Sequence, residues 1–285
     1  MKKIYIIYIL YIFLYTELLA EVSLISPSSI YIQSDKKSFK DSGTVNSIYF
    51  STGTLSYLSE FSYTHTDIRY KYSTNNLIQN EITMFYSRFF INHSYKVGIH
   101  TNSTTDTDLQ NGTTMIIGYN HWNWFIKNKL SYGVELYDSY YTNGRDLKNT
   151  KRNIKISQLM THIDYFSPFI LFSNFISLKI NYENAYTYNK NLFFLELKNI
   201  IYYKTFTFEL NYFGGELQTG VLAGGAIVYN SKDIIKNKYG IKIGYQISSN
   251  INVNLAYTNI LLDEYKSINA INNSTISLNV SYRFR

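Results

Sequence analysis

The chain consists largely of short segments in which apolar and polar residues alternate, and polar breaks separate these segments. Residues 273–285, which read NSTISLNVSYRFR, show the pattern most clearly. A period of two places successive residues on opposite faces of a β-strand. We find no stretch with the period of an amphipathic helix, so the sequence predicts an all-β protein.

Residues 273–285 are expected to form a strand with one apolar and one polar face. The apolar face would carry Ile276, Leu278, Val280, Tyr282 and Phe284. Segments of the same kind occur at residues 55–64, 95–100, 130–136, 178–183, 193–198, 206–212, 241–246 and 252–257, and weaker ones at 82–90, 115–122 and 154–165. Many short alternating segments indicate a sandwich or a barrel.

The composition of the polar faces favours a barrel in a membrane over a soluble sandwich. Only 16% of the residues are charged, whereas the solvated faces of a large sandwich would need many more. Aromatic residues also gather at segment ends, as at Trp122 and Trp124 or at Tyr140 and Tyr141. Aromatic girdles of this kind mark the two membrane interfaces of transmembrane barrels. Closure of the barrel satisfies every backbone group in lipid.

The first twenty residues have the features of a secretory signal peptide. Lys2 and Lys3 precede an apolar stretch at residues 4–15, and Ala20 supplies a small residue for cleavage before Glu21. Cleavage after residue 20 is the prediction, and an uncleaved membrane anchor is the alternative. Elsewhere the sequence lacks the ~18 consecutive apolar residues of a spanning helix.

Charge and cysteine content exclude several classes of function. The formal net charge is +7, but the basic residues form no run longer than two or three, so nucleic-acid binding is not expected. Cysteine is absent, which excludes disulfides, thiol catalysis and cysteine-ligated metals. The histidines show no metal-ligand spacing, and no phosphate-binding loop occurs. The sequence therefore predicts no metal site and no cofactor.

The breaks between segments give a strand count. Residues 21–43 are polar and Ser-rich and are predicted to be a periplasmic lead-in, followed by the barrel at 44–285. Outer-membrane barrels have an even number of strands and short periplasmic turns. Twelve strands are preferred if residues 214–238 form a long loop, at or in the barrel mouth. Fourteen strands are the alternative, with residues 217–230 counted as a strand and residues 45–51 added.

The leader, the alternating segments and the final strand resemble the outer-membrane β-barrel proteins of Gram-negative bacteria. In that family the last strand has hydrophobes at every second position and an aromatic end, which the barrel-assembly machinery recognises. Ile276, Leu278, Val280, Tyr282 and Phe284 match these positions, and Arg285 after the aromatic departs from the pattern. The resemblance implies an outer-membrane location, contact with outer-membrane lipid, and periplasmic chaperones and the assembly machinery as partners. It leaves the oligomeric state open.

The polar faces of the strands predict which side chains line the lumen. These candidates are Glu60, Lys96, His100, Glu135, Lys179, Glu183, Glu196, Lys198, Glu209, Lys242 and Arg283. With histidine neutral, five positive charges face five negative ones, which predicts a lumen of weak charge selectivity. In the alternative interpretation, these charges pair across a filled interior and only stabilise the barrel.

A barrel hydrolase is the third hypothesis. Asp106 and Asp108 form one potential carboxylate pair, and His162 and Asp164 form an imidazole–carboxylate pair that could activate water. In the predicted topology these two pairs lie at opposite ends of the barrel. The sequence therefore predicts no catalytic residues and favours a narrow passive channel. A closed structural or surface-binding barrel is the second hypothesis.

Overall fold

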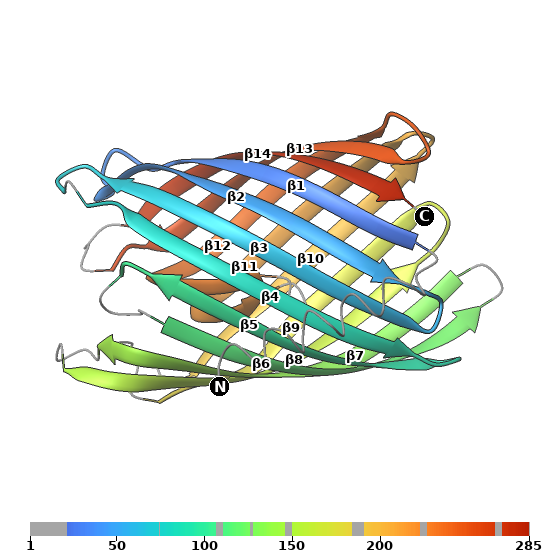
Figure 1. Ribbon diagram of the computed structural model, residues 1–285, viewed down its shortest axis with the longest axis horizontal. Helices are drawn as coiled ribbons and strands as arrows, with labels where there is room; N and C mark the ends of the chain where they lie inside the picture. Colours follow the sequence, from blue (N-terminus) through green and yellow to red (C-terminus); the bar gives the residue numbers. More distant parts are fainter. Residues whose placement is uncertain are drawn as a thin grey trace.

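The computed structural model describes residues 22–73, 75–106, 111–125, 128–145, 150–183, 191–222, 227–265 and 270–284. The strands are β1 (Val22–Gln33), β2 (Lys40–Gly53), β3 (Tyr57–Tyr70), β4 (Leu77–Phe89), β5 (His93–Thr104), β6 (Asn111–Phe125), β7 (Asn128–Arg145), β8 (Lys151–Phe166), β9 (Ile170–Glu183), β10 (Asn191–Tyr203), β11 (Phe206–Leu222), β12 (Ile227–Gln246), β13 (Ile251–Asp263) and β14 (Ala270–Phe284). Each strand is antiparallel to its chain neighbours, and β14 pairs with β1 to close the barrel (Figure 1). The predicted up-and-down barrel is confirmed.

The barrel has fourteen strands, the number of the alternative count; residues 45–51 lie in β2 as that count expected, whereas residues 217–222 and 227–230 belong to β11 and β12, and the fourteenth strand is β1. All twelve strands of the preferred count are present as β3–β14, and the two additional strands lie before them. The prediction that residues 21–43 form a periplasmic lead-in is wrong, because β1 and the start of β2 lie in this stretch. The predicted leader at 1–20 lies outside the described residues. Within the described part of the chain, we find no helix long and apolar enough to span a membrane.

Strand β1 was missed because its sequence is rich in serine and contains Pro27. Proline has no N–H and cannot donate to a sheet ladder. The pairing of β1 with β14 runs through Ile25 and resumes at Ser28, on either side of this proline. Asn279 on β14 donates to the Ser26 hydroxyl at 2.7 Å and to the Pro27 carbonyl at 3.2 Å. A side chain thus bridges the interruption in the ladder at the seam of the barrel.

The connections at the two ends of the barrel differ in length. At one end, which we call the turn end, they lie at residues 54–56, 90–92, 126–127, 167–169, 204–205 and 247–250. The first residue of β1 and the last of β14 also lie there, with Ser23 paired to Phe284. At the other end, the loop end, most connections are longer, as at 34–39, 71–76 and 105–110. Because two strands are added, the strand number stays even. The long connections therefore lie mostly at one end of the barrel and the short ones at the other, as the twelve-strand count predicted.

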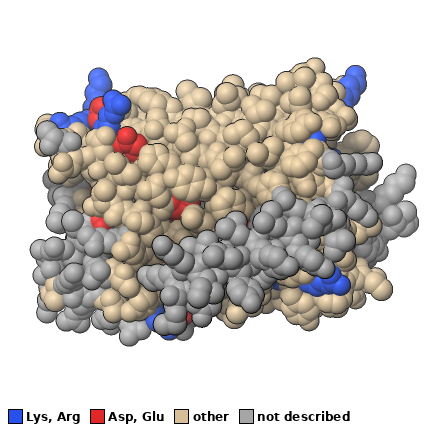
Figure 2. All heavy atoms as spheres, in the orientation of Figure 1, with Lys and Arg blue, Asp and Glu red and all other residues tan. Residues whose placement is uncertain are grey.

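The outer face of the barrel carries an apolar band. Ile276, Leu278, Val280 and Tyr282 on β14 are all exposed, as are large hydrophobic side chains on the other strands. Figure 2 shows charged side chains gathered toward the ends of the described surface, with a broad, largely uncharged region between them. A surface of this kind is stable against lipid but not against water. At the turn end, the rings of Tyr282 and Phe284 stack with their centroids 6.0 Å apart.

The barrel encloses a cluster of buried apolar side chains that we call the apolar cluster. Its members are Ile116, Tyr137, Tyr141, Ile154, Ile156, Met160, Leu192, Phe194, Phe213, Leu217, Val221, Leu222, Val228 and Ile235, with Phe85, Phe175 and Ile260 packed against it. The cluster joins residues of β6–β8 and β10–β12. Part of the lumen is therefore filled by side chains.

The outer part of the β11–β12 hairpin contributes many of these buried residues. We call residues 215–222 and 227–236 the hairpin tip. The predicted loop at 214–238 is wrong, because this stretch continues both strands, with Val221 paired to Val228. Register shifts between Gly214 and Thr219, and the φ of +128° at Gly215, interrupt the regular ladder there. Such bulges bend a strand, and glycine tolerates this backbone conformation.

The hairpin tip lies against the inner face of β8, three strands away around the barrel. The Gln158 side-chain N–H donates to the backbone carbonyl of Val221 at 2.9 Å. The backbone N–H of Val221 donates to Oε1 of the same Gln158 side chain, also at 2.9 Å. Leu217 and Val221 are fully buried. Only a segment folded into the interior could make these contacts, and Val221, Leu222 and Val228 are thereby removed from water.

Candidate solute sites in the barrel lumen

A cavity of about 480 Å³ lies between the hairpin tip and the loop-end halves of β1–β4, and we call it the mouth cavity. Apolar side chains from both sides line it, including Val45, Ile68, Ile235 and Leu262. Its charged lining residues are Lys40, Glu81, Asp106, Lys232, Asp233 and Glu264. The space is large enough for a small organic solute.

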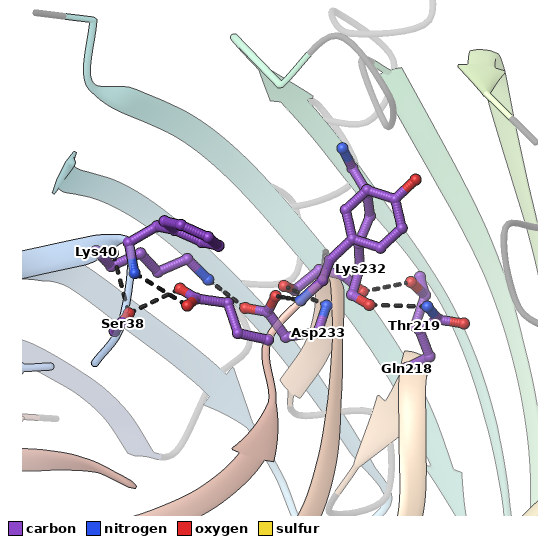
Figure 3. A network of polar contacts seen from close by, with 10 residues as sticks. Ser38, Lys40, Gln218, Thr219, Lys232 and Asp233 are labelled. Carbon is purple, nitrogen blue, oxygen red and sulfur yellow. Dashed lines mark hydrogen bonds and ion pairs between the residues drawn. The ribbon is translucent and has the colours of Figure 1, made fainter. Parts of the chain in front are cut away.

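The charged groups at the mouth cavity form a network across the barrel mouth (Figure 3). Lys40 on β2 forms an ion pair with Asp233 on β12. Asp233 also accepts the backbone N–H of Tyr265 at 2.9 Å. Glu264 accepts the Ser38 hydroxyl at 2.7 Å and, through its other oxygen, the backbone N–H of Phe39 at 2.9 Å. These contacts tie the β1–β2 connection to the hairpin tip and the β13–β14 connection.

The network also reaches the far side of the mouth. The Lys232 ammonium on β12 lies 3.3 Å from Asp106, which follows β5, and 4.8 Å from the centre of the Tyr265 ring. β5 lies on the opposite side of the barrel from β12. Figure 3 shows the chain of contacts continuing from Lys232 to Gln218 and Thr219 on β11, whose side chains donate to backbone carbonyls of β12. The hairpin tip therefore spans the mouth.

A second cavity, of about 330 Å³, lies nearer the turn end, and we call it the inner cavity. It is lined by Glu60, Phe85, Ser87, Ser94, Lys96, Gly118, Tyr119, Asn120, Glu135, His162, Asp164 and Phe175. The apolar cluster borders both cavities. Its members Val228 and Ile235, with Ile260 packed on them, line the mouth cavity, whereas Phe85 and Phe175, which also pack on the cluster, line the inner cavity. The apolar cluster thus separates the two cavities.

An ion pair crosses one wall of the inner cavity. Lys96 on β5 pairs with Glu135 on β7, which also accepts the hydroxyl of Tyr137. The strand between them presents Gly118, in register with both residues. A Cβ at Gly118 would lie 3.3–3.4 Å from atoms of both side chains, so the absence of a side chain there lets the pair close over β6. Lys96 and Glu135, two of the predicted lumen residues, are brought together in this way.

Three buried polar atoms at the inner cavity have no hydrogen-bond partner among the described residues. They are Asn120 Oδ1, His162 Nδ1 and Asp164 Oδ1. The other carboxylate oxygen of Asp164 accepts the Ser131 hydroxyl at 3.1 Å and lies 3.7 Å from His162 Nε2. The His162 ring packs over Gly133, where a Cβ would approach His162 Cε1 to 2.5 Å. Burial of polar atoms without partners is unusual in proteins.

The inner face of β4 joins the two cavities. Gln79 and Glu81 line the mouth cavity, and Phe85 and Ser87 line the inner cavity. Between them lies Thr83, whose hydroxyl is 2.7 Å from His100 Nδ1 on β5. His100 Nε2 lies 3.5 Å from Glu81. His100, a predicted lumen residue, thus lies on the wall between the cavities.

A separate group of predicted lumen residues meets on β10–β12. Glu209 forms ion pairs with Lys242 and, at 3.7 Å, with Lys198, and it also accepts the Asn211 side-chain amide at 2.9 Å. Glu209 is buried, whereas Lys198 and Lys242 are partly exposed. One carboxylate is therefore shared by two ammonium groups at this wall.

Three further predicted lumen residues lie on β3, β10 and β14. Glu60 lines the inner cavity and accepts the Tyr49 hydroxyl at 2.6 Å, Glu196 is half-buried on β10, and Arg283 is exposed at the turn end of β14. Lys179 and Glu183 lie on β9, but their side chains lie outside the described part of the structure.

Sequence reasoning missed most of the mouth cavity. Lys40 fell in the predicted lead-in, and Lys232 and Asp233 fell in the predicted loop. Glu81 lies just before the weakly alternating segment at 82–90, and Asn120, at the inner cavity, carries no charge that would single it out. The neighbouring Lys-Asp at 232–233 was a visible signal, but its partners are far away in sequence and only the closed barrel brings them together.

The two potential catalytic pairs do not form one site. Asp106 lines the mouth cavity, and His162 and Asp164 line the inner cavity. Asp108 lies outside the described residues. Among the side chains that the structure describes, no group of three or more His, Asp or Glu residues could hold a metal ion.

Several solved structures are similar to this chain over most of its length. The Ralstonia pickettii toluene transporter TbuX is 8% identical over 95% of this chain and 91% of its own, with a TM-score of 0.54. Pseudomonas aeruginosa OccK8 (OprE) is 8% identical over 93% of this chain and 98% of its own, with a TM-score of 0.46. Pseudomonas aeruginosa OccK2 (OpdF), solved in complex with glucuronate, is 9% identical over 93% and 99%, with a TM-score of 0.44. No protein-family model matches the sequence, and no curated protein matches it.

The likeness to TbuX concerns the fold. Together with the closed ladder and the apolar outer band, it identifies the chain as a β-barrel of the type found in the outer membranes of Gram-negative bacteria.

Proposed function

We propose that the protein is an outer-membrane channel whose lumen is narrowed by the β11–β12 hairpin to a side path along β3–β5. The observation that carries this proposal is the set of contacts from the hairpin tip to β2, β8 and Asp106 after β5. A hairpin that only extended the barrel wall could not reach these strands. By the rule of short periplasmic turns, the turn end faces the periplasm and the hairpin lies at the extracellular mouth.

The path that remains would run through the two cavities. The inner face of β4 lines both of them, and along this face Thr83 lies between the cavities, beside Glu81 and His100; elsewhere the apolar cluster separates them. Movement of these side chains, rather than of the strands, would be enough to connect the cavities. A solute would therefore pass singly and slowly in comparison with an open porin.

Weak charge selectivity is the second part of the proposal. Three of the predicted lysines form ion pairs with two of the predicted glutamates, Lys96 with Glu135 and both Lys198 and Lys242 with Glu209. A charge that is already paired contributes little net field along a path. The expected ratio of cation to anion permeability is therefore close to one.

A closed structural barrel is the competing function, and the apolar cluster favours it. The fully buried Phe194 and Leu217 show that part of the interior is packed like a protein core. In this alternative the hairpin is a permanent plug and the cavities do not communicate.

Planar-bilayer recordings distinguish the two functions. The variant for this test replaces residues 215–236 with an Asn-Gly turn, which suits a two-residue hairpin. We expect small discrete currents from the native barrel and several-fold larger ones from the variant. Gln158→Ala, which removes both hydrogen bonds to Val221, should give intermediate or more variable currents. Silence from the native barrel, correctly folded, would favour the closed barrel.

We further propose that β14 is recognised during assembly by periplasmic chaperones and the barrel-assembly machinery. The outward positions of Ile276, Leu278, Val280 and Tyr282 and the aromatic Phe284 support this role, as does the closing contact of β14 with β1. Comparison of membrane insertion for Phe284→Ala and for a chain lacking Arg285 tests it. Loss of insertion is expected for the first variant and not for the second.

A further inference from the structure

The inner cavity has the chemistry of a site for a positively charged group. We propose that it binds small solutes that carry a protonated amine, with the amine held by Asn120, His162 and Asp164. This inference rests on the proposed channel function only in that the cavity would lie on the path. Binding itself requires no conduction.

Unsatisfied acceptors provide the first argument. Asp164 Oδ2 faces His162 Nε2 at 3.7 Å, which favours the tautomer with its proton on Nε2. In that tautomer His162 Nδ1 is an acceptor, like Asn120 Oδ1 and Asp164 Oδ1. Among the described residues none of these three atoms has a hydrogen-bond partner, and His162 is only 8% exposed. An ammonium group has three donors and no acceptor, so it complements such a set.

The charges around the inner cavity also favour a positively charged ligand. Glu60, Glu135 and Asp164 contribute three carboxylates to the lining, and Lys96 contributes one ammonium. Lys129 also acts electrostatically on Asp164, and its ammonium lies 4.5 Å from the centre of the Trp122 ring. Even when both lysines are counted, the carboxylates are in excess by one. This local excess favours the binding of a cationic group in the cavity.

The walls of the cavity suit an aliphatic amine. Phe85 and Phe175 present rings to the cavity, and the Phe175 ring lies 5.5 Å from that of His162. Lys96 already lies 5.4 Å from the centre of the Phe85 ring, which shows that this wall accepts an ammonium group. Gly118 and Gly133 leave room for the Lys96–Glu135 pair and for the His162 ring, which cover these two positions.

Equilibrium binding to the purified full-length barrel in detergent tests the proposal. The probe is radiolabelled 1,4-diaminobutane, and 1,4-butanediol is the uncharged competitor. We expect one saturable diamine site for which the diol does not compete. Absence of saturable diamine binding, or equal competition by the diol, would overturn the proposal, the latter in favour of a polyol site.

Two variants locate the site. Asp164→Asn removes a charge but keeps the shape and an oxygen for Ser131, and it should weaken diamine binding about tenfold or more. Asn120→Ala removes an acceptor that has no partner among the described residues, so it should weaken binding without affecting folding. Unchanged affinity in both variants would place the diamine elsewhere and contradict the proposal.

The matched control is Asp138→Asn on β7. Asp138 is 54% exposed on the outside of the barrel, where it pairs with Lys155 at 3.7 Å. This change removes the same charge from the same protein, and diamine affinity should not change. If the diamine fails to bind while the native barrel conducts, only this inference is lost. If it binds to a barrel that is silent in bilayers, the channel function is lost and the site remains.

Discussion

The two cavities lie in one barrel and both contain several charged side chains. They differ in whether the charged groups have hydrogen-bond or ion-pair partners. At the mouth cavity, Asp233, Asp106 and Glu264 each have a cation or hydrogen-bond donor within reach. The atoms without a described partner there are neutral, on Ser34 and Asn273. At the inner cavity, one such atom belongs to the carboxylate of Asp164.

This difference separates a structural network from a binding site. The mouth charges hold the hairpin tip across the barrel, so a ligand would have to compete with contacts that already exist. The inner cavity offers acceptors that are already desolvated and oriented, and a ligand with donors would complete them. The numbers of acidic and basic residues do not distinguish the two cavities. The difference lies in which buried polar atoms have a hydrogen-bond partner.

The largest effect is expected in the apolar cluster that separates the cavities. Phe194→Ala removes a fully buried ring that lies 5.0 Å from the ring of Phe213. A core change of this size lowers the free energy of unfolding by about 3–5 kcal/mol. Denaturant unfolding of the barrel in lipid bilayers would measure this loss, and the bilayer current should rise as the wall loosens. Phe193→Ala, at the exposed neighbouring position, is the control and should cost less.

A smaller loss of stability is expected at the mouth network. Asp233→Asn breaks the ion pair with Lys40, whose side chain is mostly buried. Breaking a buried pair by changing one partner costs about 3 kcal/mol. The same unfolding measurement checks this value, and Asp138→Asn at the exposed pair should cost less than about 1 kcal/mol. Diamine binding should be unchanged in Asp233→Asn; weaker binding would show that the cavities are not independent.

Removal of the Lys96 ammonium from the inner cavity should increase the difference between the two cavities in their affinity for a cation. Lys96→Met leaves Glu135 with the Tyr137 hydroxyl and without its ammonium partner. The cavity becomes more negative, so diamine affinity should rise by about tenfold or less. Bilayer recordings should also show a shift toward cation selectivity. Lys40→Met at the mouth is the matched change, and it should lower stability without tightening diamine binding.

The smallest effect is expected outside both cavities, at the loop-end rim. The backbone N–H of Lys37 donates to Asp35 at 2.9 Å and holds the pKa of this carboxyl below its usual value. The ionised form therefore stabilises the β1–β2 connection at neutral pH, and this contribution is lost as the pH falls through the lowered pKa. Hydrogen-exchange protection of the Lys37 amide should decrease in acid. Asp35→Asn should remove most of this pH dependence.

Alternation predicted the barrel because a strand in a membrane barrel has one face in lipid and one in the lumen, whatever the rest of the fold does. The same pattern gave the outward positions of β14 and the parity of the breaks. It missed β1, where serines and Pro27 obscure the pattern. It also predicted a loop where the hairpin tip lies, because residues 217–222 are buried on both faces and do not alternate.

The sequence by itself therefore determined the class of fold, the lipid-facing stripe and which ends of the strands lie together. These properties depend on neighbouring residues and on a period of two. Only the tertiary structure decided where the charges find partners. Lys232 and Asp106, Lys40 and Asp233, or Gln158 and Val221 are distant in the chain, and each pair meets only because the barrel closes and the hairpin bends across its mouth. The atoms that remain without partners at the inner cavity are defined by that same closure.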